Sequence, residues 1–190
     1  MKKEFVLYLG PMFSGKTTRL LSSIERHLYK KEEVVCFKPH IDGRYSNTEI
    51  VTHSSSKVKA YSVKNAGEIQ EFFDKTCLTP RVVAVDEAFM IEGCGDYLNK
   101  LFMESNATIY VSSIEMSANL NPFLEVQKMM PYATKIEKCT SICLSCYNDA
   151  QLTYRKASEP LVNSEISVGG SEAYEPRCWN CHPLANKDAK

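Results

Sequence analysis

Short apolar runs, each bounded by charged or turn-forming residues, recur through the first 138 residues. Apolar runs of four or five residues predict strands that are covered on both faces. Such a pattern is typical of a parallel sheet inside a larger fold. Runs of this kind predict strands at residues 5–9, 34–37, 81–85 and 108–111, and the more polar segment 134–137 is a candidate fifth strand.

Two stretches between these runs have the period of an amphipathic helix instead. Residues 16–31 gather leucine and isoleucine side chains on one side, and residues 66–75 turn Ile69, Phe72 and Phe73 inward. Strands that alternate with helices predict an α/β fold, with a mostly parallel sheet and helices on both faces.

The pattern changes near residue 139, where helical periodicity fades and Cys, Gly, Pro and Tyr punctuate the chain. We therefore expect two domains, an α/β domain at 1–138 and a small metal-organised module at 139–190. The polar, Ser- and Thr-rich segment 42–59 is typical of a flap or hairpin on the first of these.

Composition narrows the class of protein. The 190 residues are 44% apolar and 24% charged, as in an ordinary folded domain. Its 23 basic residues balance 23 acidic ones, and residues 139–190 carry five Lys or Arg against six Asp or Glu. Neither count favours a nucleic-acid partner. No apolar run approaches the ~20 residues of a membrane span, and the N-terminus lacks an export signal. We expect a cytoplasmic protein with no membrane partner.

The first chemical motif follows the first predicted strand. It fits G-x-x-x-x-G-K-[ST], the phosphate-binding P-loop, and it lies between a predicted strand and a predicted helix, as that loop requires. Its backbone N–H groups would cradle the phosphates of ATP, with lysine on the β- and γ-phosphates and the last hydroxyl on Mg²⁺. The predicted ATP-binding residues are Gly10, Pro11, Met12, Phe13, Ser14, Gly15, Lys16 and Thr17.

A second half of the same site is expected at the end of the strand 81–85. Asp86 follows that strand directly, as the Walker B aspartate does, so it would contribute to the ATP site and bind Mg²⁺ together with Thr17. Glu87 comes next and would act as the general base on an attacking hydroxyl or water. The alternative for Glu87 is a solvated loop carboxylate.

Four of the eight cysteines form two C-x-x-C pairs separated by 31 residues. Two such pairs supply a tetrahedral shell of four thiolates, which predicts a structural zinc ion. Disulfides are the alternative, and a reducing compartment disfavours them. His182 is the rival ligand nearby. The predicted zinc ligands are Cys143, Cys146, Cys178 and Cys181.

Taken together, these motifs resemble the type II thymidine kinases, the zinc-containing cytosolic deoxynucleoside kinases. The resemblance covers roughly residues 4–182 and includes smaller segments in the same order. Residues 42–46 resemble the family's D-x-R-Y-S, Thr52 and His53 its T-H, and residues 168–174 its substrate lasso.

The resemblance implies transfer of the γ-phosphate of ATP to the 5′-hydroxyl of thymidine, in nucleotide salvage for DNA synthesis. Glu87 would be the base, with ATP, Mg²⁺ and structural zinc as cofactors. The family is usually a homotetramer. By the same resemblance, the nucleoside would be bound by Met12, Asp42, Arg44, Ile114, Ser167, Val168, Gly169 and Tyr174.

Two positions depart from the family pattern, and both concern the base pocket. Phe89 stands where the family usually has Gln, and Ala118 replaces an aromatic residue that would pack on the base. We count both as candidate substrate-binding residues. The departures leave open a kinase for a different or 5-modified pyrimidine deoxynucleoside, or an inactive relative that only binds. A P-loop ATPase that hydrolyses ATP without nucleoside is the remaining alternative.

Overall fold

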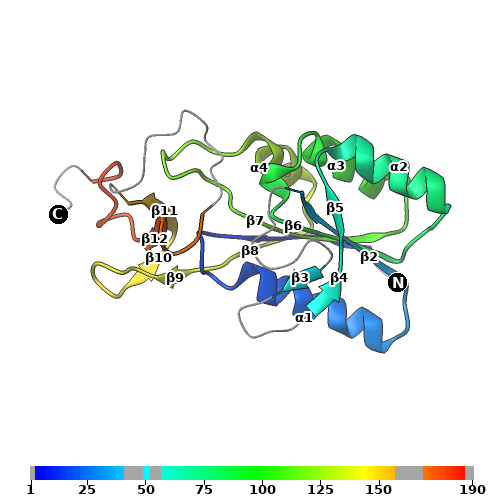
Figure 1. Ribbon diagram of the computed structural model, residues 1–190, viewed down its shortest axis with the longest axis horizontal. Helices are drawn as coiled ribbons and strands as arrows, with labels where there is room; N and C mark the ends of the chain where they lie inside the picture. Colours follow the sequence, from blue (N-terminus) through cyan, green and yellow to red (C-terminus); the bar gives the residue numbers. More distant parts are fainter. Residues whose placement is uncertain (1–2, 41–48, 52–56, 157–168, 187–190) are drawn as a thin grey trace.

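The computed structural model describes residues 3–40, 49–51, 57–156 and 169–186 (Figure 1). Its centre is a six-stranded sheet in the order β5-β2-β6-β7-β1-β8, in which all paired neighbours run parallel. The strands are β1 (Phe5–Leu9), β2 (Val34–Pro39), β5 (Tyr61–Val63), β6 (Val82–Asp86), β7 (Thr108–Ser113) and β8 (Lys135–Lys138). Five of them are the expected strands, and β5 is an addition at the edge.

Helices cover both faces of this sheet, as predicted. On one face lie α1 (Lys16–Tyr29) and a small hairpin of β3 (Glu49–Val51) and β4 (Lys57–Lys59) (Figure 1). On the other face lie α2 (Ala66–Thr76), α3 (Cys94–Glu104) and α4 (Leu124–Met129), with short 3₁₀ turns η1 (Ala88–Met90) and η2 (Met130–Tyr132). Among the described residues, no helix is long and apolar enough to cross a bilayer.

Successive side chains of each strand point to opposite faces of the sheet and pack into two separate hydrophobic cores. In β6, Val83 and Val85 pack into the core under α2–α4, while Val82 and Ala84 pack into the core under α1. Both sets are fully buried. A parallel strand covered on both sides therefore has no polar position until it ends, which is why polar side chains gather at its carboxyl end.

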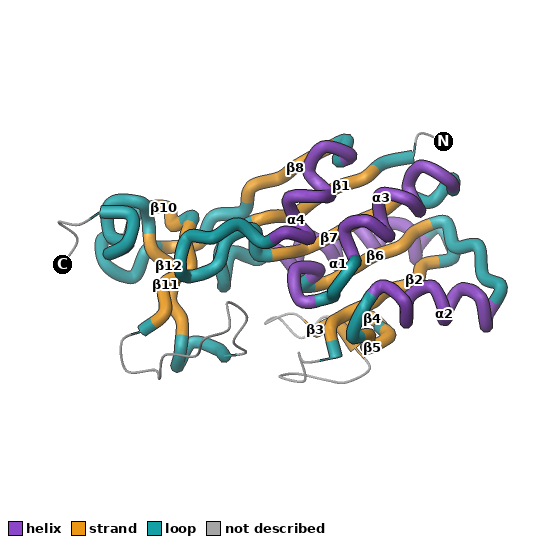
Figure 2. The backbone as a smooth tube through the Cα atoms, turned by 90° about the horizontal axis from the view of Figure 1, so that it is seen from above, coloured by secondary structure: helices purple, strands orange, loops and turns teal. Residues whose placement is uncertain are grey.

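The chain leaves the main sheet at Lys138, and the residues that follow form short antiparallel pairs. We call residues 139–156 and 169–186 the cysteine module. Its strands are β9 (Ser141–Ile142), β10 (Asp149–Ala150), β11 (Leu152–Arg155) and β12 (Tyr174–Arg177). Figure 2 shows the module beyond one end of the sheet strands, and hydrogen bonds to Leu9, Met12 and Phe13 place it against the end at which β1 leads into α1.

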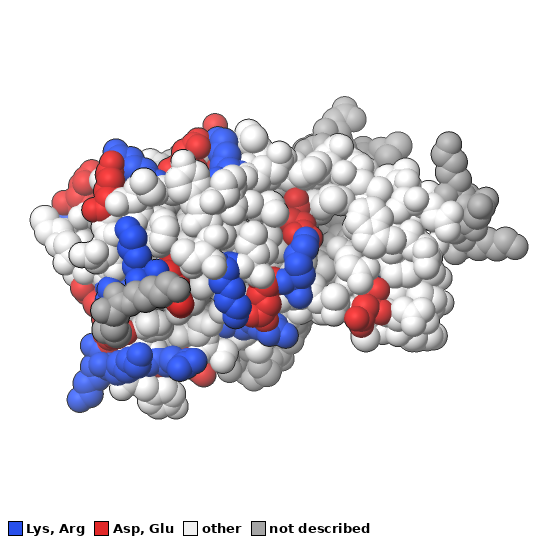
Figure 3. Space-filling view, turned by 180° about the vertical axis from the view of Figure 1, so that it is seen from behind, with Lys and Arg blue, Asp and Glu red and all other residues white. Residues whose placement is uncertain are grey.

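Charged side chains are distributed unevenly on the face turned away in Figure 1. Over the α/β part, Lys and Arg are mixed with Asp and Glu, while the end formed by the module shows few charges on this face (Figure 3). Lys128 and Asp96 form one of the surface ion pairs of the α/β part. Interspersed signs produce no strong field of one sign over this face.

Candidate active site

The loop between β1 and α1 has the backbone geometry of a phosphate cradle. Gly15 has φ 75° and ψ 17°, the left-handed conformation that glycine adopts without strain, and it caps the N-terminus of α1. Lys16 is 5% exposed, and its Nζ donates a hydrogen bond to the Pro11 carbonyl at 2.8 Å. The Ser14 hydroxyl donates to the same carbonyl at 2.8 Å. The loop thus folds back on itself at the positive end of a helix.

Gly10 is required for a different reason. A Cβ built on it would lie 2.1 Å from the carbonyl oxygen of Cys139, far inside van der Waals contact. The first glycine of the motif therefore lets the loop pass directly under the start of the cysteine module.

Asp86 closes the site from the end of β6, which is separated from β1 by β7. The Thr17 hydroxyl, on the first turn of α1, donates to its carboxylate at 3.2 Å, and the buried Ser112 hydroxyl of β7 donates to the same carboxylate. Two elements far apart in sequence thus bring the predicted magnesium ligands, Thr17 and Asp86, together. Hydroxyl and carboxylate oxygens are hard ligands of the kind Mg²⁺ takes.

Glu87 occupies a left-handed backbone conformation, with φ 48° and ψ 47°, between β6 and η1. Such a conformation is uncommon for a residue with a side chain, and it costs roughly 1 kcal/mol or more unless the surroundings enforce it. It ends the strand sharply, so that the half-buried Glu87 directly follows the carboxylate held by Thr17. Strained residues of this kind concentrate at functional sites.

Lys38 is a residue that sequence reasoning did not single out. Phe37 pairs in register with Val85, so Lys38 and Asp86 come next on neighbouring strands, and both follow residues of the other core. They therefore stand on the α1 face, where Lys38 is 6% exposed. The sequence signal that could have identified Lys38 is a charged residue at the end of an apolar strand.

The residues predicted to surround the base are only partly brought together. Phe89 is 7% exposed, and its ring centroid lies 4.4 Å from that of Phe123. Ile114 belongs to the same core, and Met12 and Met90 pack against it from the rim. Phe123, which precedes α4, was missed because it follows a turn and not a strand.

Other predicted residues lie elsewhere or cannot be placed. Ala118 sits in a tight turn in which the Ser117 N–H bonds to the Asn121 carbonyl at 2.9 Å. Tyr174 begins β12, is 8% exposed, and its ring lies beside Gly169, where an added Cβ would be 3.2 Å from Cε2. The remaining predicted residues, Asp42, Arg44, Ser167 and Val168, lie outside the described residues.

The four predicted zinc ligands converge in the cysteine module. The sulfur atoms of Cys143, Cys146, Cys178 and Cys181 all lie within 4.8 Å of one another, with Cys146 and Cys178 at 3.6 Å. A tetrahedral ion with bonds of about 2.3 Å requires sulfur–sulfur separations of about 3.8 Å. All eight cysteines of the chain are free thiols in the structure. The cluster is therefore compatible with zinc.

Local hydrogen bonding supports this reading of the cluster. Burial raises the pKa of the Cys143 thiol, but the backbone N–H groups of Cys178, Ser145 and Cys146 outweigh burial and bring that pKa down to about 6. Contacts with the sulfur atoms of Cys146 and Cys178 raise the pKa of Cys181 to about 12, because four thiols crowded together cannot all ionise without a cation between them. Donors that favour a thiolate are what a metal-binding turn supplies. His182 is fully buried, with Nε2 3.3 Å from the Thr153 carbonyl, so its ring faces β11.

Comparisons with known proteins show which protein family this chain resembles. The family model described as thymidine kinase matches residues 3–182. A thymidine kinase from Mesoplasma florum is 31% identical over 188 residues, covering 94% of this chain and 90% of the relative.

Among solved structures, the genome packaging NTPase B204 of Sulfolobus turreted icosahedral virus 2 has two similar forms. The complex with ATP-gammaS has a TM-score of 0.44 at 16% identity and covers 68% of this chain and 72% of that one. The sulfate complex has a TM-score of 0.45 at 17% identity and covers 76% of each chain. The family match spans both the phosphate loop and the four cysteines. The chain belongs to the thymidine kinase family.

Proposed function

We propose that this protein transfers the γ-phosphate of ATP to the 5′-hydroxyl of thymidine, giving dTMP and ADP. The observation that carries the proposal is the contact between Thr17 and Asp86, which joins a phosphate loop to a carboxylate pair in a chain of the thymidine kinase family. Phosphoryl transfer needs this combination of anion cradle, metal ligands and base.

Each part of the site has a role in that reaction. The loop from Gly10 to Lys16 binds the phosphates, and the Lys16 ammonium leaves the Pro11 carbonyl for the β- and γ-phosphates. Thr17 and Asp86 hold Mg²⁺, which neutralises phosphate charge when bound. Glu87 accepts the proton of the 5′-hydroxyl as that oxygen attacks.

The cysteine module has a structural role in this scheme. Cys143, Cys146, Cys178 and Cys181 would hold zinc, and a site of four thiolates would brace the module without taking part in the reaction. The module thereby fixes both ends of the chain segment that precedes Tyr174, and Tyr174 with Gly169 contacts the nucleoside. A homotetramer in the cytoplasm is the form that the resemblance to type II thymidine kinases favours.

The test is ATP-dependent phosphorylation of a panel of nucleosides, comprising thymidine, deoxyuridine, 5-substituted deoxyuridines, deoxycytidine and the purine deoxynucleosides. Glu87→Gln keeps the size of the side chain but removes the base, and we expect kcat to fall at least about 100-fold while ATP still binds. Glu92→Gln, at an exposed glutamate five residues on, is the matched control and should retain wild-type turnover.

The panel also separates the alternatives. Turnover of another pyrimidine in place of thymidine would show that Phe89 and Ala118 mark a changed base pocket. ATP hydrolysis without any nucleoside would point to an ATPase, and binding without product to an inactive relative. More than a few per cent of activity in Glu87→Gln would remove Glu87 from the role of base.

A further inference from the structure

The cysteine module forms three hydrogen bonds with the backbone of the phosphate loop and of the residue just before it. The Met12 N–H donates a hydrogen bond to the Thr153 hydroxyl at 3.1 Å, and the Ser141 hydroxyl donates to the Phe13 carbonyl at 3.2 Å. The Cys139 N–H donates to the Leu9 carbonyl at 2.6 Å, just before the loop begins. Polar groups in the middle of the loop are thus satisfied by residues more than 120 positions away.

The loop needs such support at this point. Phe13 has φ 64°, a left-handed conformation that is unfavourable for a residue with a side chain. The Phe13 carbonyl accepts the hydrogen bond from Ser141. The N–H of Met12, the residue before Phe13, donates to Thr153. The two hydroxyls therefore flank the strained residue and favour its conformation.

Thr153 is in turn connected to the cysteine cluster. Its carbonyl accepts a hydrogen bond from Nε2 of His182 at 3.3 Å, while Nδ1 of the same ring accepts from the Leu184 N–H at 3.3 Å. The His182 N–H donates to the Cys178 carbonyl at 3.0 Å. A fully buried ring with both nitrogens engaged is a rigid link between the second cysteine pair and β11.

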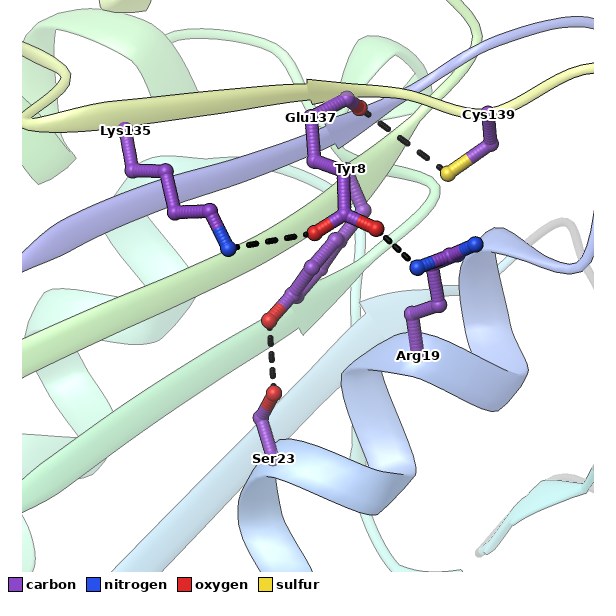
Figure 4. Close-up of polar contacts among 6 residues, drawn as sticks. All are labelled: Tyr8, Arg19, Ser23, Lys135, Glu137 and Cys139. Carbon is purple, nitrogen blue, oxygen red and sulfur yellow. Dashed lines mark hydrogen bonds and ion pairs between the residues drawn. The ribbon is translucent and has the colours of Figure 1, made fainter.

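The strand that carries the chain into the module is fixed as well. Glu137 of β8 forms an ion pair with Arg19 of α1 and contacts Lys135 at 3.2 Å, as Figure 4 shows. Tyr8 of β1 bonds to Ser23 of α1 at 2.6 Å beside them. The base of the module is therefore anchored to the strand and helix that enclose the phosphate loop.

From these contacts we propose that Thr153 and Ser141 are positioning residues for the phosphate loop, so that the cysteine module sets the affinity for ATP as well as contacting the nucleoside. The ligand in this inference rests on the proposed function, but the loop geometry does not. A loop that reaches its binding geometry only part of the time binds its ligand more weakly in proportion to that fraction.

The experiment measures ADP binding by calorimetry with no nucleoside present, so it does not depend on catalysis. Thr153→Val preserves shape but leaves the Met12 N–H without its acceptor, and we expect the Kd for ADP to rise about three- to tenfold. Thr153→Ser restores the hydroxyl and should bind ADP within about twofold of wild type. Ser141→Ala, at a half-buried position that tolerates a smaller side chain, should weaken ADP binding in the same direction.

Steady-state kinetics and metal analysis complete the test. We expect the KM for ATP to rise with the Kd for ADP, while bound metal per chain stays at the wild-type value. ADP affinity within twofold of wild type in both Thr153→Val and Ser141→Ala would overturn the proposal. So would a lower kcat with unchanged ADP affinity. If Thr153→Val does not fold, Ser141→Ala decides the matter alone.

If neither variant nor wild type phosphorylates thymidine, the proposed function fails, yet the calorimetric comparison still decides the role of the two hydroxyls.

Discussion

Asp86 is the residue at which the two halves of the site meet. Its carboxylate accepts hydrogen bonds from Thr17 on α1 and from Ser112 on β7, so it is oriented from two directions. The same carboxylate is thereby kept ready for a divalent cation at the mouth of the phosphate loop.

Replacement of Asp86 by Asn should abolish metal use without unfolding the chain. The amide is neutral and keeps one acceptor oxygen, so the two hydroxyls can still bond to it. We expect kcat to fall about 100- to 1,000-fold, because charge stabilisation in the transition state is lost. ADP binding without Mg²⁺ should change little. Asp96→Asn, at a surface carboxylate paired with Lys128, is the control. Wild-type kcat in Asp86→Asn would show that the metal is held elsewhere.

Phe89 offers a second test at the residue scale, because its ring packs against Phe123 in the core. Phe89→Gln introduces the residue usual in type II thymidine kinases but buries an amide there, and it should lower the free energy of unfolding by roughly 3 kcal/mol. Phe89→Leu should cost about 1 kcal/mol. Denaturant unfolding measures both. A stable Phe89→Gln protein with altered nucleoside preference would place this side chain in the base pocket instead.

At the scale of elements, the success of the sequence-based prediction of each strand or helix depended largely on how clear the apolar pattern of that segment was. Four strands, β1, β2, β6 and β7, were recognisable because a strand covered on both faces is apolar along most of its length. The edge strand β8 is largely exposed and more polar, so its pattern was weaker. The strand β5 is only three residues long and had no pattern of its own. The helix α3 does have an apolar face, with Cys94 and Leu98 buried and Leu101 and Phe102 packed against the core, and this face was overlooked. A strand as short as β5 forms because the sheet offers an unpaired edge beside β2, which the local sequence does not record.

The end of α1 shows how one element is fixed by polar contacts. Nδ1 of His27 donates to the Glu32 carboxylate at 2.5 Å, and Nε2 lies 3.1 Å from the Tyr110 hydroxyl of β7. The hydrogen bond from His27 lowers the pKa of Glu32 from its ordinary value of 4.5, against the opposing effect of burial. The turn after α1 is thus tied to the sheet through a charged group.

This contact should make stability depend on pH in a defined direction. Because the folded state lowers the pKa of Glu32, its contribution is present above about pH 4.5 and is lost as the pH falls through the folded value. Glu32→Gln should therefore be less stable than wild type at pH 7, and the stabilities of the two proteins should converge as the pH falls below the lowered pKa of Glu32. Glu33→Gln, at the exposed neighbour, should follow the wild type. A difference in unfolding free energy between wild type and Glu32→Gln that is the same at every pH would contradict this account.

At the scale of the whole molecule, the site is assembled from segments that no local pattern connects. The phosphate loop, the Asp86–Glu87 pair and the two cysteine pairs were recognisable in sequence because each chemistry requires a fixed local spacing. Thr153, Ser141 and Phe123 were not recognisable, since their roles arise only when distant segments meet. Asp42, Arg44, Ser167 and Val168 lie outside the described residues, and their roles remain predictions.

The placement of the eight thiols gives a test of the module within the whole fold. Cys77 is exposed, whereas burial raises the pKa of Cys36 to about 12 and also raises the pKa values of Cys94 and Cys139. Thiolates react and buried thiols do not. With zinc holding the other four, the native protein should show one fast-reacting thiol, five after chelation and eight after unfolding. Cys77→Ser should remove the fast phase, and metal analysis should find one zinc per chain. Five fast thiols before chelation, or four that react only after reduction, would contradict a four-thiolate zinc site.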